Sequence, residues 1–182
     1  MKSVRSTELW VFGYGSLIWQ PGFPYMEAVP GVLDGYARQF CMWSVQFRGT
    51  QQSPGLVLAL KQEAGASCHG LTYRVSDDRA GPVLAQLRER ELVLSAYRET
   101  RETVVLGDGR TVAAVCFVID PTHELYCGKL SADEQARIIS RASGTRGDNR
   151  EYLYWTCAHL DRLGLSDPEL TALKARVRKL TP

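Results

Sequence analysis

The stretch LWVFGYGSL, residues 9–17, begins as an apolar strand and ends in a turn that contains Gly13 and Gly15. Glycine permits the positive φ of a sharp turn and leaves nearby backbone N–H groups uncovered. Uncovered N–H groups can bind an anion or stabilise a developing oxyanion. The stretch therefore predicts a strand that leads into an anion-binding turn, with a plain glycine turn between core strands as the alternative.

Two better-known glycine motifs do not fit this stretch. A dinucleotide-binding fingerprint needs a third glycine where the chain has Ile18, and it needs a helix that Pro21 and Gly22 would interrupt. A nucleophile elbow has the pattern Gly-x-Ser-x-Gly, and Ser16 is not bracketed in that way. We therefore reject a Rossmann fold and a hydrolase elbow for this turn.

Outward from the turn, the first part of the chain consists mostly of predicted strands. Aromatic and β-branched residues gather in several further stretches. These strands are predicted at residues 36–47, 56–60, 71–75, 103–106 and 112–119. The sequence Gly107-Asp108-Gly109 between the last two is a strong hairpin signal.

One helix is predicted among the strands, and three follow them. Apolar spacing favours a helix over residues 81–97, and cap-forming residues begin the later helices. Those caps are Ser131 with Glu134, Asp148, and Asp167 with Pro168. Strands followed by helices are typical of an α+β fold, so we expect a curved, mostly antiparallel sheet or small barrel covered by helices.

Length and composition suit one domain over residues 1–182. Hydrophobic residues make up 45% of the chain, charged residues 23%, and the net charge is +2. Basic residues are interspersed with acidic ones, and apolar runs are too short for a membrane span, so we expect neither nucleic acid nor a membrane as partner. Five cysteines without framework spacing, and no apolar signal at the start, predict reduced thiols and a cytoplasmic protein.

The cysteines and histidines do not have the spacing of metal ligands. The sequence has no Cys-x-x-Cys, and neither Cys68-His69 nor Cys157-x-His159 is a zinc pattern. We therefore expect no metal site. A Cys–His nucleophile pair could be assembled only in space, and the sequence neither shows nor excludes it. Cys116 lies in a predicted strand and is expected in the core.

The helix predicted at 81–97 places one carboxylate on its apolar face. At about 100° per residue, Leu84 and Leu87 belong to that face, and Glu91 follows Leu87 by one turn. A carboxylate buried there needs a partner or a raised pKa, and a raised pKa suits a general acid or base near neutral pH. The alternatives are an ion pair with Arg90 or Arg98, or a helix that ends before residue 91.

Three more side chains are candidates for substrate binding. Arg48 follows a predicted strand, and its guanidinium could hold a substrate carboxylate through two hydrogen bonds. A solvated turn arginine is the alternative. Tyr97 and Tyr152 are amphipathic and could orient a ligand, although such residues more often lie half-buried in a core.

Taken in order, these segments resemble the ChaC-like γ-glutamylcyclotransferases, a family that acts on glutathione. The resemblance extends over residues 9–180, and the order and spacing of its motifs are more specific than any single motif. The motifs are FGYGSL at 12–17, GYARQF at 35–40, RGT at 48–50, PG at 54–55, GLTYRV at 70–75, RE at 90–91, DGRT at 108–111 and NREYL at 149–153.

The resemblance implies a small mixed, largely antiparallel β-barrel flanked by helices, with no metal and no organic cofactor. It also implies an intramolecular reaction in which the γ-glutamyl α-amino group attacks, so that glutathione becomes 5-oxoproline and cysteinylglycine. Glu91 matches the family's catalytic glutamate and would be the general acid/base. The substrate-binding residues that it implies are Tyr14, Gly15, Ser16, Leu17 and Tyr152.

Two positions depart from the family pattern. Phe47 stands where members commonly have histidine, and Leu56 stands where they commonly have arginine after Pro-Gly. If that arginine grips a glutathione carboxylate, its loss puts the substrate in question, and Arg48 could compensate. The alternatives are therefore a cyclotransferase for another γ-glutamyl amide, or a module that binds glutathione without turnover. The sequence does not fix the oligomeric state.

Overall fold

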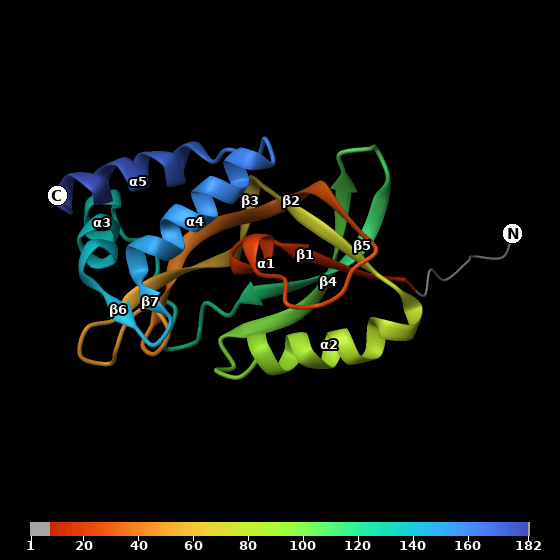
Figure 1. Cartoon of the computed structure of the whole chain (residues 1–182), viewed down its shortest axis with the longest axis horizontal. Helices are drawn as coiled ribbons and strands as arrows, with labels where there is room; N and C mark the ends of the chain where they lie inside the picture. The colour runs from red at the N-terminus through yellow and green to blue at the C-terminus, as the bar shows by residue number, and fades with distance from the viewer. Residues whose placement is uncertain (1–7, 182) are drawn as a thin grey trace, which may run out of the picture.

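The computed structural model describes residues 8–181, and a closed barrel of five strands forms its centre (Figure 1). The order round the barrel is β1-β3-β2-β4-β5, and β5 closes it by pairing parallel to β1 and β3. The pairings β1–β3, β2–β3, β2–β4 and β4–β5 are antiparallel. The strands are β1 (Leu9–Gly13), β2 (Glu27–Ser44), β3 (Gly55–Val75), β4 (Tyr97–Leu106) and β5 (Thr111–Ile119). The predicted small mixed, largely antiparallel barrel flanked by helices is confirmed.

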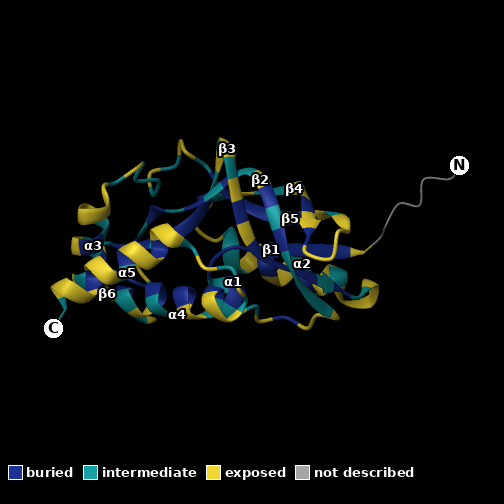
Figure 2. Ribbon diagram, turned by 90° about the horizontal axis from the view of Figure 1, so that it is seen from above, coloured by how far each residue is buried: buried dark blue, intermediate teal, exposed yellow. Residues whose placement is uncertain are grey.

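Helices cover two parts of this barrel. In Figure 1, α3, α4 and α5 gather at one end, and α2 lies along another side. Burial is concentrated where the strands and the inward faces of the helices meet, as the dark blue segments of Figure 2 show. No described helix is long and apolar enough to cross a membrane. The helices are α1 (Ser16–Trp19), α2 (Asp77–Glu91), α3 (Ala132–Arg141), α4 (Asn149–Arg162) and α5 (Pro168–Leu180), and a short hairpin pairs β6 (Ser143–Gly144) with β7 (Gly147–Asp148).

Strand β3 differs from the sequence prediction because it is continuous. The sequence predicts separate strands at 56–60 and 71–75, whereas β3 also includes the polar residues between them. Those residues pair with β2, for example Asp34 with Ser67 and Tyr36 with Gln62. Several of them are exposed, so the apolar alternation that marks a half-buried strand is absent there. The extent of β3 is therefore set by its partner strand.

The prediction for α2 is wrong at both ends. The helix begins at Asp77, with acidic residues in its first turn, and ends at Glu91. Leu92 donates its N–H to the carbonyl of Arg88 and closes the last turn. Ser95 then has a φ of +54°, which turns the chain into β4. Tyr97 consequently lies on a strand opposite Ile119, and Glu91 lies at a helix end.

The three later helices begin at the predicted caps. Ser131 and Glu134 form both bonds of a capping box before α3, and Asp167 accepts the N–H groups of Glu169 and Leu170 before α5. Asp148 occupies the N-cap position of α4 but makes no side-chain cap bond; it pairs with Arg150. Cys116 is fully buried in β5, which confirms its place in the core.

The buried side-chain amide of Asn149 attaches the start of α4 to β3. Asn149 Oδ1 accepts the Leu56 N–H at 2.8 Å, and Asn149 Nδ2 donates to the Leu56 carbonyl at 2.7 Å. Asn149 and Leu56 are both fully buried, so water cannot replace these bonds. The side chain thus takes the place of a strand partner and fixes α4 at the barrel end.

Replacing Asn149 with alanine is expected to lower the free energy of unfolding by about 2–5 kcal/mol, because two buried groups of Leu56 lose their partners. Urea unfolding measures the change. Arg150→Ala, next in the chain, breaks only the exposed pair with Asp148 and is expected to cost less than about 1 kcal/mol. A comparably small loss for Asn149→Ala would show that these two bonds do not hold α4 in place.

Candidate functional site

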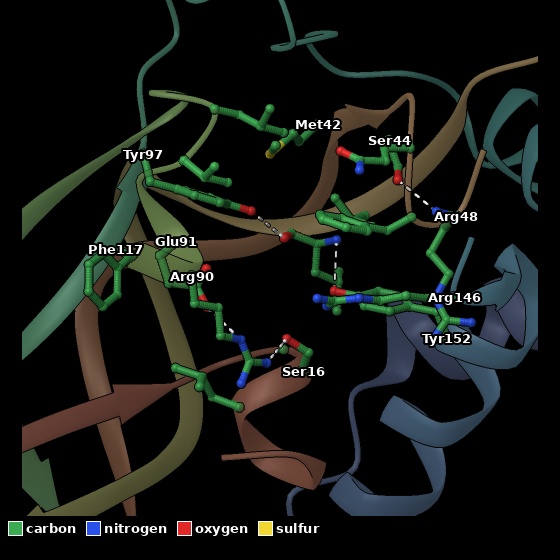
Figure 3. A pocket seen from close by; sticks show the side chains of 18 of the residues that line it. Ser16, Met42, Ser44, Arg48, Arg90, Glu91, Tyr97, Phe117, Arg146 and Tyr152 are labelled. Carbon is green, nitrogen blue, oxygen red and sulfur yellow. Dashed lines mark hydrogen bonds and ion pairs between the residues drawn. The ribbon is translucent and has the colours of Figure 1, made fainter. Parts of the chain in front are cut away.

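One pocket collects side chains from several distant parts of the chain (Figure 3). The turn after β1, the end of β2, the end of α2 and the start of α4 each contribute to its wall. It encloses about 1100 Å³ of space when its open mouth is included. The structure brings all of the sequence candidates together in its lining, namely Tyr14, Gly15, Ser16, Leu17, Arg48, Glu91, Tyr97 and Tyr152.

The glycine turn enters the pocket where β1 stops pairing. The β1–β3 ladder ends at Gly13 opposite Leu71, and Gly15 is the N-cap of α1. Neither Gly13 nor Gly15 has a positive φ, so the predicted reason for these glycines is wrong. A Cβ at Gly15 would lie 3.2 Å from Tyr152 Oη, so the absence of a side chain there makes room for that phenol. The first N–H groups of α1 have no carbonyl within their own helix to bond.

Glu91 lies on the α2 face that carries the buried Val83 and Leu87, as its spacing predicts. Its side chain is 15% exposed, and the carboxylate is drawn at the pocket in Figure 3. Burial raises the pKa of Glu91, and the positive charges of Arg90 and Arg146 oppose that shift in part. Glu91 is therefore a carboxylate that holds a proton more readily than one in water.

Arg90 does more than pair with the carboxylate. Its Nε lies 3.3 Å from Glu91 Oε1, as one of the sequence alternatives expected, whereas Arg98 pairs with Asp120. The same guanidinium donates to Ser16 Oγ at 3.0 Å and to the carbonyl of Gln20 at 2.9 Å. Arg90 thus binds α1 to the end of α2 and keeps the turn beside Glu91.

One residue of β3 orients two phenols of the pocket. The Tyr97 hydroxyl donates to the Leu58 carbonyl at 3.2 Å, and the Leu58 N–H donates to Tyr152 Oη at 3.2 Å (Figure 3). Burial raises the pKa of Tyr97 and Tyr152, and the nearby charge of Glu91 adds to the shift. Both phenols stay protonated near neutral pH, and because Tyr152 Oη accepts from Leu58, its own proton can serve a ligand.

Two arginines of the pocket have different surroundings. Arg48 has a side chain only 6% exposed; it donates to the Asp148 carbonyl at 3.2 Å and stacks over Trp155. Arg146 lies 4.1 Å from the ring centroid of Phe47, and within residues 8–181 no carboxylate is in ion-pair distance of it. Its only sequence signal is a position just before the 149–153 motif, so sequence reasoning missed it.

Leu56 and Phe47, the two positions that depart from the family pattern, lie in different parts of the structure. Leu56 is fully buried in the core and is not part of the pocket lining. Phe47 lines the pocket and supports the Arg146 guanidinium. The difference at Phe47 therefore changes the site, whereas the difference at Leu56 does not alter its lining. Among the described residues, no three His, Cys, Asp or Glu side chains are grouped so as to hold a metal ion.

Known proteins resemble this chain over almost its whole length. Residues 9–180 match the family described as ChaC-like protein. The glutathione-specific γ-glutamylcyclotransferase of Escherichia coli (strain K12) is 38% identical, over 94% of this chain and 74% of its own length. The protein of the same name from Schizosaccharomyces pombe is 36% identical, over 94% and 93%. A crystal structure of a yeast γ-glutamyl cyclotransferase specific to glutathione has a TM-score of 0.85 at 25% identity, covering 94% of this chain and 96% of that one.

Glu91→Gln is expected to stabilise the folded protein at pH 8 and to lose that advantage toward pH 4. The pKa of Glu91 is raised in the folded state, so ionisation costs stability above that pKa and costs nothing below the unfolded pKa, where both states are protonated. Urea unfolding at several pH values measures the difference from wild type. Glu89→Gln removes an exposed carboxylate from the same helix and is the control. If the free energy of unfolding of wild type rose relative to that of Glu91→Gln as the pH rises, the raised pKa of Glu91 would be contradicted.

Proposed function

The chain belongs to the ChaC-like family, as its motifs predict, and we propose that it is a γ-glutamylcyclotransferase that degrades glutathione to 5-oxoproline and cysteinylglycine. The observation that carries the proposal is the buried carboxylate of Glu91 in a pocket shared with the glycine turn and the phenols of Tyr97 and Tyr152. The names of the bacterial and yeast relatives support the reaction and the substrate.

The proposed reaction needs a proton carrier more than a protein nucleophile. The α-amino group of the γ-glutamyl unit is an ammonium ion near neutral pH and must lose a proton before it can attack. Its nitrogen then bonds to the γ-carboxyl carbon, and the amide C–N bond to cysteine breaks. Two protons leave the attacking nitrogen in all, and the departing nitrogen gains two, so no water is consumed. Glu91 would accept a proton and deliver it to the leaving nitrogen, and its raised pKa makes it a stronger base.

Ring closure is intramolecular, so the pocket has mainly to hold the substrate in attack geometry. The N–H groups of residues 15–17 and the free proton of Tyr152 would stabilise the oxyanion that forms on the γ-carbonyl. The Ser16 hydroxyl is already engaged by Arg90, so in this scheme Ser16 contributes its backbone. Tyr97 would form the wall beside Glu91.

We place the glycine carboxylate of glutathione at Arg146. Arg90 and Arg48 are bound by acceptors of the protein. Arg146 lines the pocket against the ring of Phe47, and among residues 8–181 its guanidinium donates no hydrogen bond to a protein acceptor. A guanidinium suits a carboxylate because two parallel N–H groups can donate to it. Arg48 also lines the pocket, but its guanidinium is engaged by the Asp148 carbonyl and by Glu151.

Two alternatives use the same pocket. A cyclotransferase for another γ-glutamyl amide would not need the positive charge of Arg146, and a binding module would not need a proton carrier at Glu91. We further propose that the chain acts as one domain in the cytoplasm, for which the unpaired cysteines of the described residues are the support.

In a time course with glutathione, wild type is expected to release equal molar amounts of 5-oxoproline and cysteinylglycine, measured by mass spectrometry. Glu91→Gln is expected to lose at least about a hundredfold in kcat, as for the loss of a general base, with the fold intact by circular dichroism. Glu89→Gln is the matched control. A fully active Glu91→Gln protein would refute the mechanism, and saturable binding without any product from wild type would favour the binding module.

Arg146→Gln is expected to raise KM for glutathione at least about tenfold, since a charged hydrogen-bonded pair is lost. With glutathione esterified at glycine, wild type and Arg146→Gln are expected to have similar KM values, because the ester has no charge to lose. Arg150→Gln, outside the pocket lining, controls for the loss of one positive charge. An equal rise in KM for both substrates would place the glycine carboxylate elsewhere.

A further inference from the structure

Arg38 of β2 is a buried cation directly behind the glycine turn. Its side chain is 4% exposed. Nη1 donates to the Tyr14 carbonyl at 3.1 Å and to the His69 carbonyl at 3.0 Å, and Nη2 also donates to His69. Arg38 does not line the pocket, whereas Tyr14 and Gly15 do. The guanidinium therefore holds the turn from the side away from the substrate.

The position of Arg38 follows from the end of a strand. The β1–β3 ladder stops at Gly13 opposite Leu71, so Tyr14 after β1, and Gly70 and His69 on β3, lie just beyond its last pair. Carbonyl groups at such a point lose the partners that a continued ladder would supply, and a buried carbonyl needs one. The guanidinium of Arg38 donates hydrogen bonds to one carbonyl on each side, Tyr14 after β1 and His69 in β3.

We propose that Arg38 is a positioning residue for the reaction, acting by fixing the Tyr14–Gly15 peptide so that the Gly15 N–H points into the pocket. In a trans peptide the N–H lies opposite the carbonyl. Because the Tyr14 carbonyl is turned to Arg38, the Gly15 N–H is turned away from it, toward the pocket that Gly15 lines. That N–H finds no acceptor among residues 8–181. The inference rests on the proposed function, in which this N–H stabilises the oxyanion.

Arg38 also strengthens the group that it orients. A cation that donates to a peptide carbonyl polarises the peptide, and the N–H at its other end becomes a better donor. Lysine could keep the charge but not the planar fork that reaches two carbonyls at once. Without the guanidinium of Arg38, the Tyr14–Gly15 peptide would lose both its fixed orientation and its polarisation.

Asp167 supplies the counter-charge that such a buried cation requires. Its Oδ2 lies 3.6 Å from Arg38 Nε, which makes no hydrogen bond. Oδ1 of the same side chain accepts the N–H groups of Glu169 and Leu170 and caps α5. A buried charge left without a partner is strongly destabilising. The start of α5 is therefore coupled electrostatically to the glycine turn through Arg38.

The test compares Arg38→Lys and Asp167→Asn with Arg74→Lys, a sheet arginine that pairs with Glu8 and Glu27 away from the pocket. With glutathione, Arg38→Lys is expected to lower kcat about ten- to a hundredfold, while the pH profile of kcat, which reports Glu91, keeps its shape. Asp167→Asn keeps a good N-cap and is expected to lower kcat by a smaller factor. Arg74→Lys is expected to stay within about twofold of wild type.

A second readout follows the peptide itself. In ¹H–¹⁵N spectra of the unliganded protein, Arg38→Lys and Asp167→Asn are expected to displace the Gly15 amide resonance, and Arg74→Lys is not. If Arg38→Lys does not fold, Asp167→Asn decides by both readouts. Folded variants with wild-type kcat, or a lowered kcat with the Gly15 resonance unmoved, would overturn the proposal. Absence of turnover in wild type would instead refute the proposed function, and the resonance would still test the link from Arg38 to Gly15.

Discussion

A carboxylate largely shielded from water is the constraint on which the rest of the site depends. Glu91 is buried by the barrel, and that burial raises its pKa. The opposing positive charges of Arg90 and Arg146 keep its ionised form accessible, so that it can both take and return a proton. Arg90 also bonds to Ser16, so the guanidinium that pairs with Glu91 also holds the glycine turn next to it.

The barrel brings backbone groups that are distant in the sequence to the wall of the pocket. Leu58, a buried residue near the start of β3, bonds to a phenol from β4 and a phenol from α4, and Asn149 attaches α4 to the same strand. Arg38 holds the turn from behind. The two phenols that line the pocket are thus fixed by backbone groups of the sheet, which suits a reaction that depends on the geometry of the bound substrate.

The features that the sequence predicted correctly depend on residues close to one another in the chain. The spacing of Leu84, Leu87 and Glu91 depends on one helical turn, and the caps of α3 and α5 depend on residues within three positions of each other. The features that it predicted wrongly depend on residues distant in the sequence. The length of β3 is set by its pairing with β2, and α2 ends before Tyr97, which pairs with Ile119 in the sheet. Leu56 looked important in a linear motif, yet its side chain lies in the core. Arg146 lies outside the quoted motifs. Arg38 lies inside the 35–40 motif, but its contacts with the Tyr14 and His69 carbonyls depend on the folded barrel and could not be deduced from spacing.

The measurement that tests the account most directly is turnover of glutathione in ¹⁸O-labelled water. Attack by the substrate's own amine consumes no water, so the account predicts 5-oxoproline without ¹⁸O and an equal amount of cysteinylglycine. Free glutamate carrying one ¹⁸O in its γ-carboxyl group would show that water is the nucleophile. That result would contradict the role given to Glu91 as a proton carrier for an intramolecular ring closure.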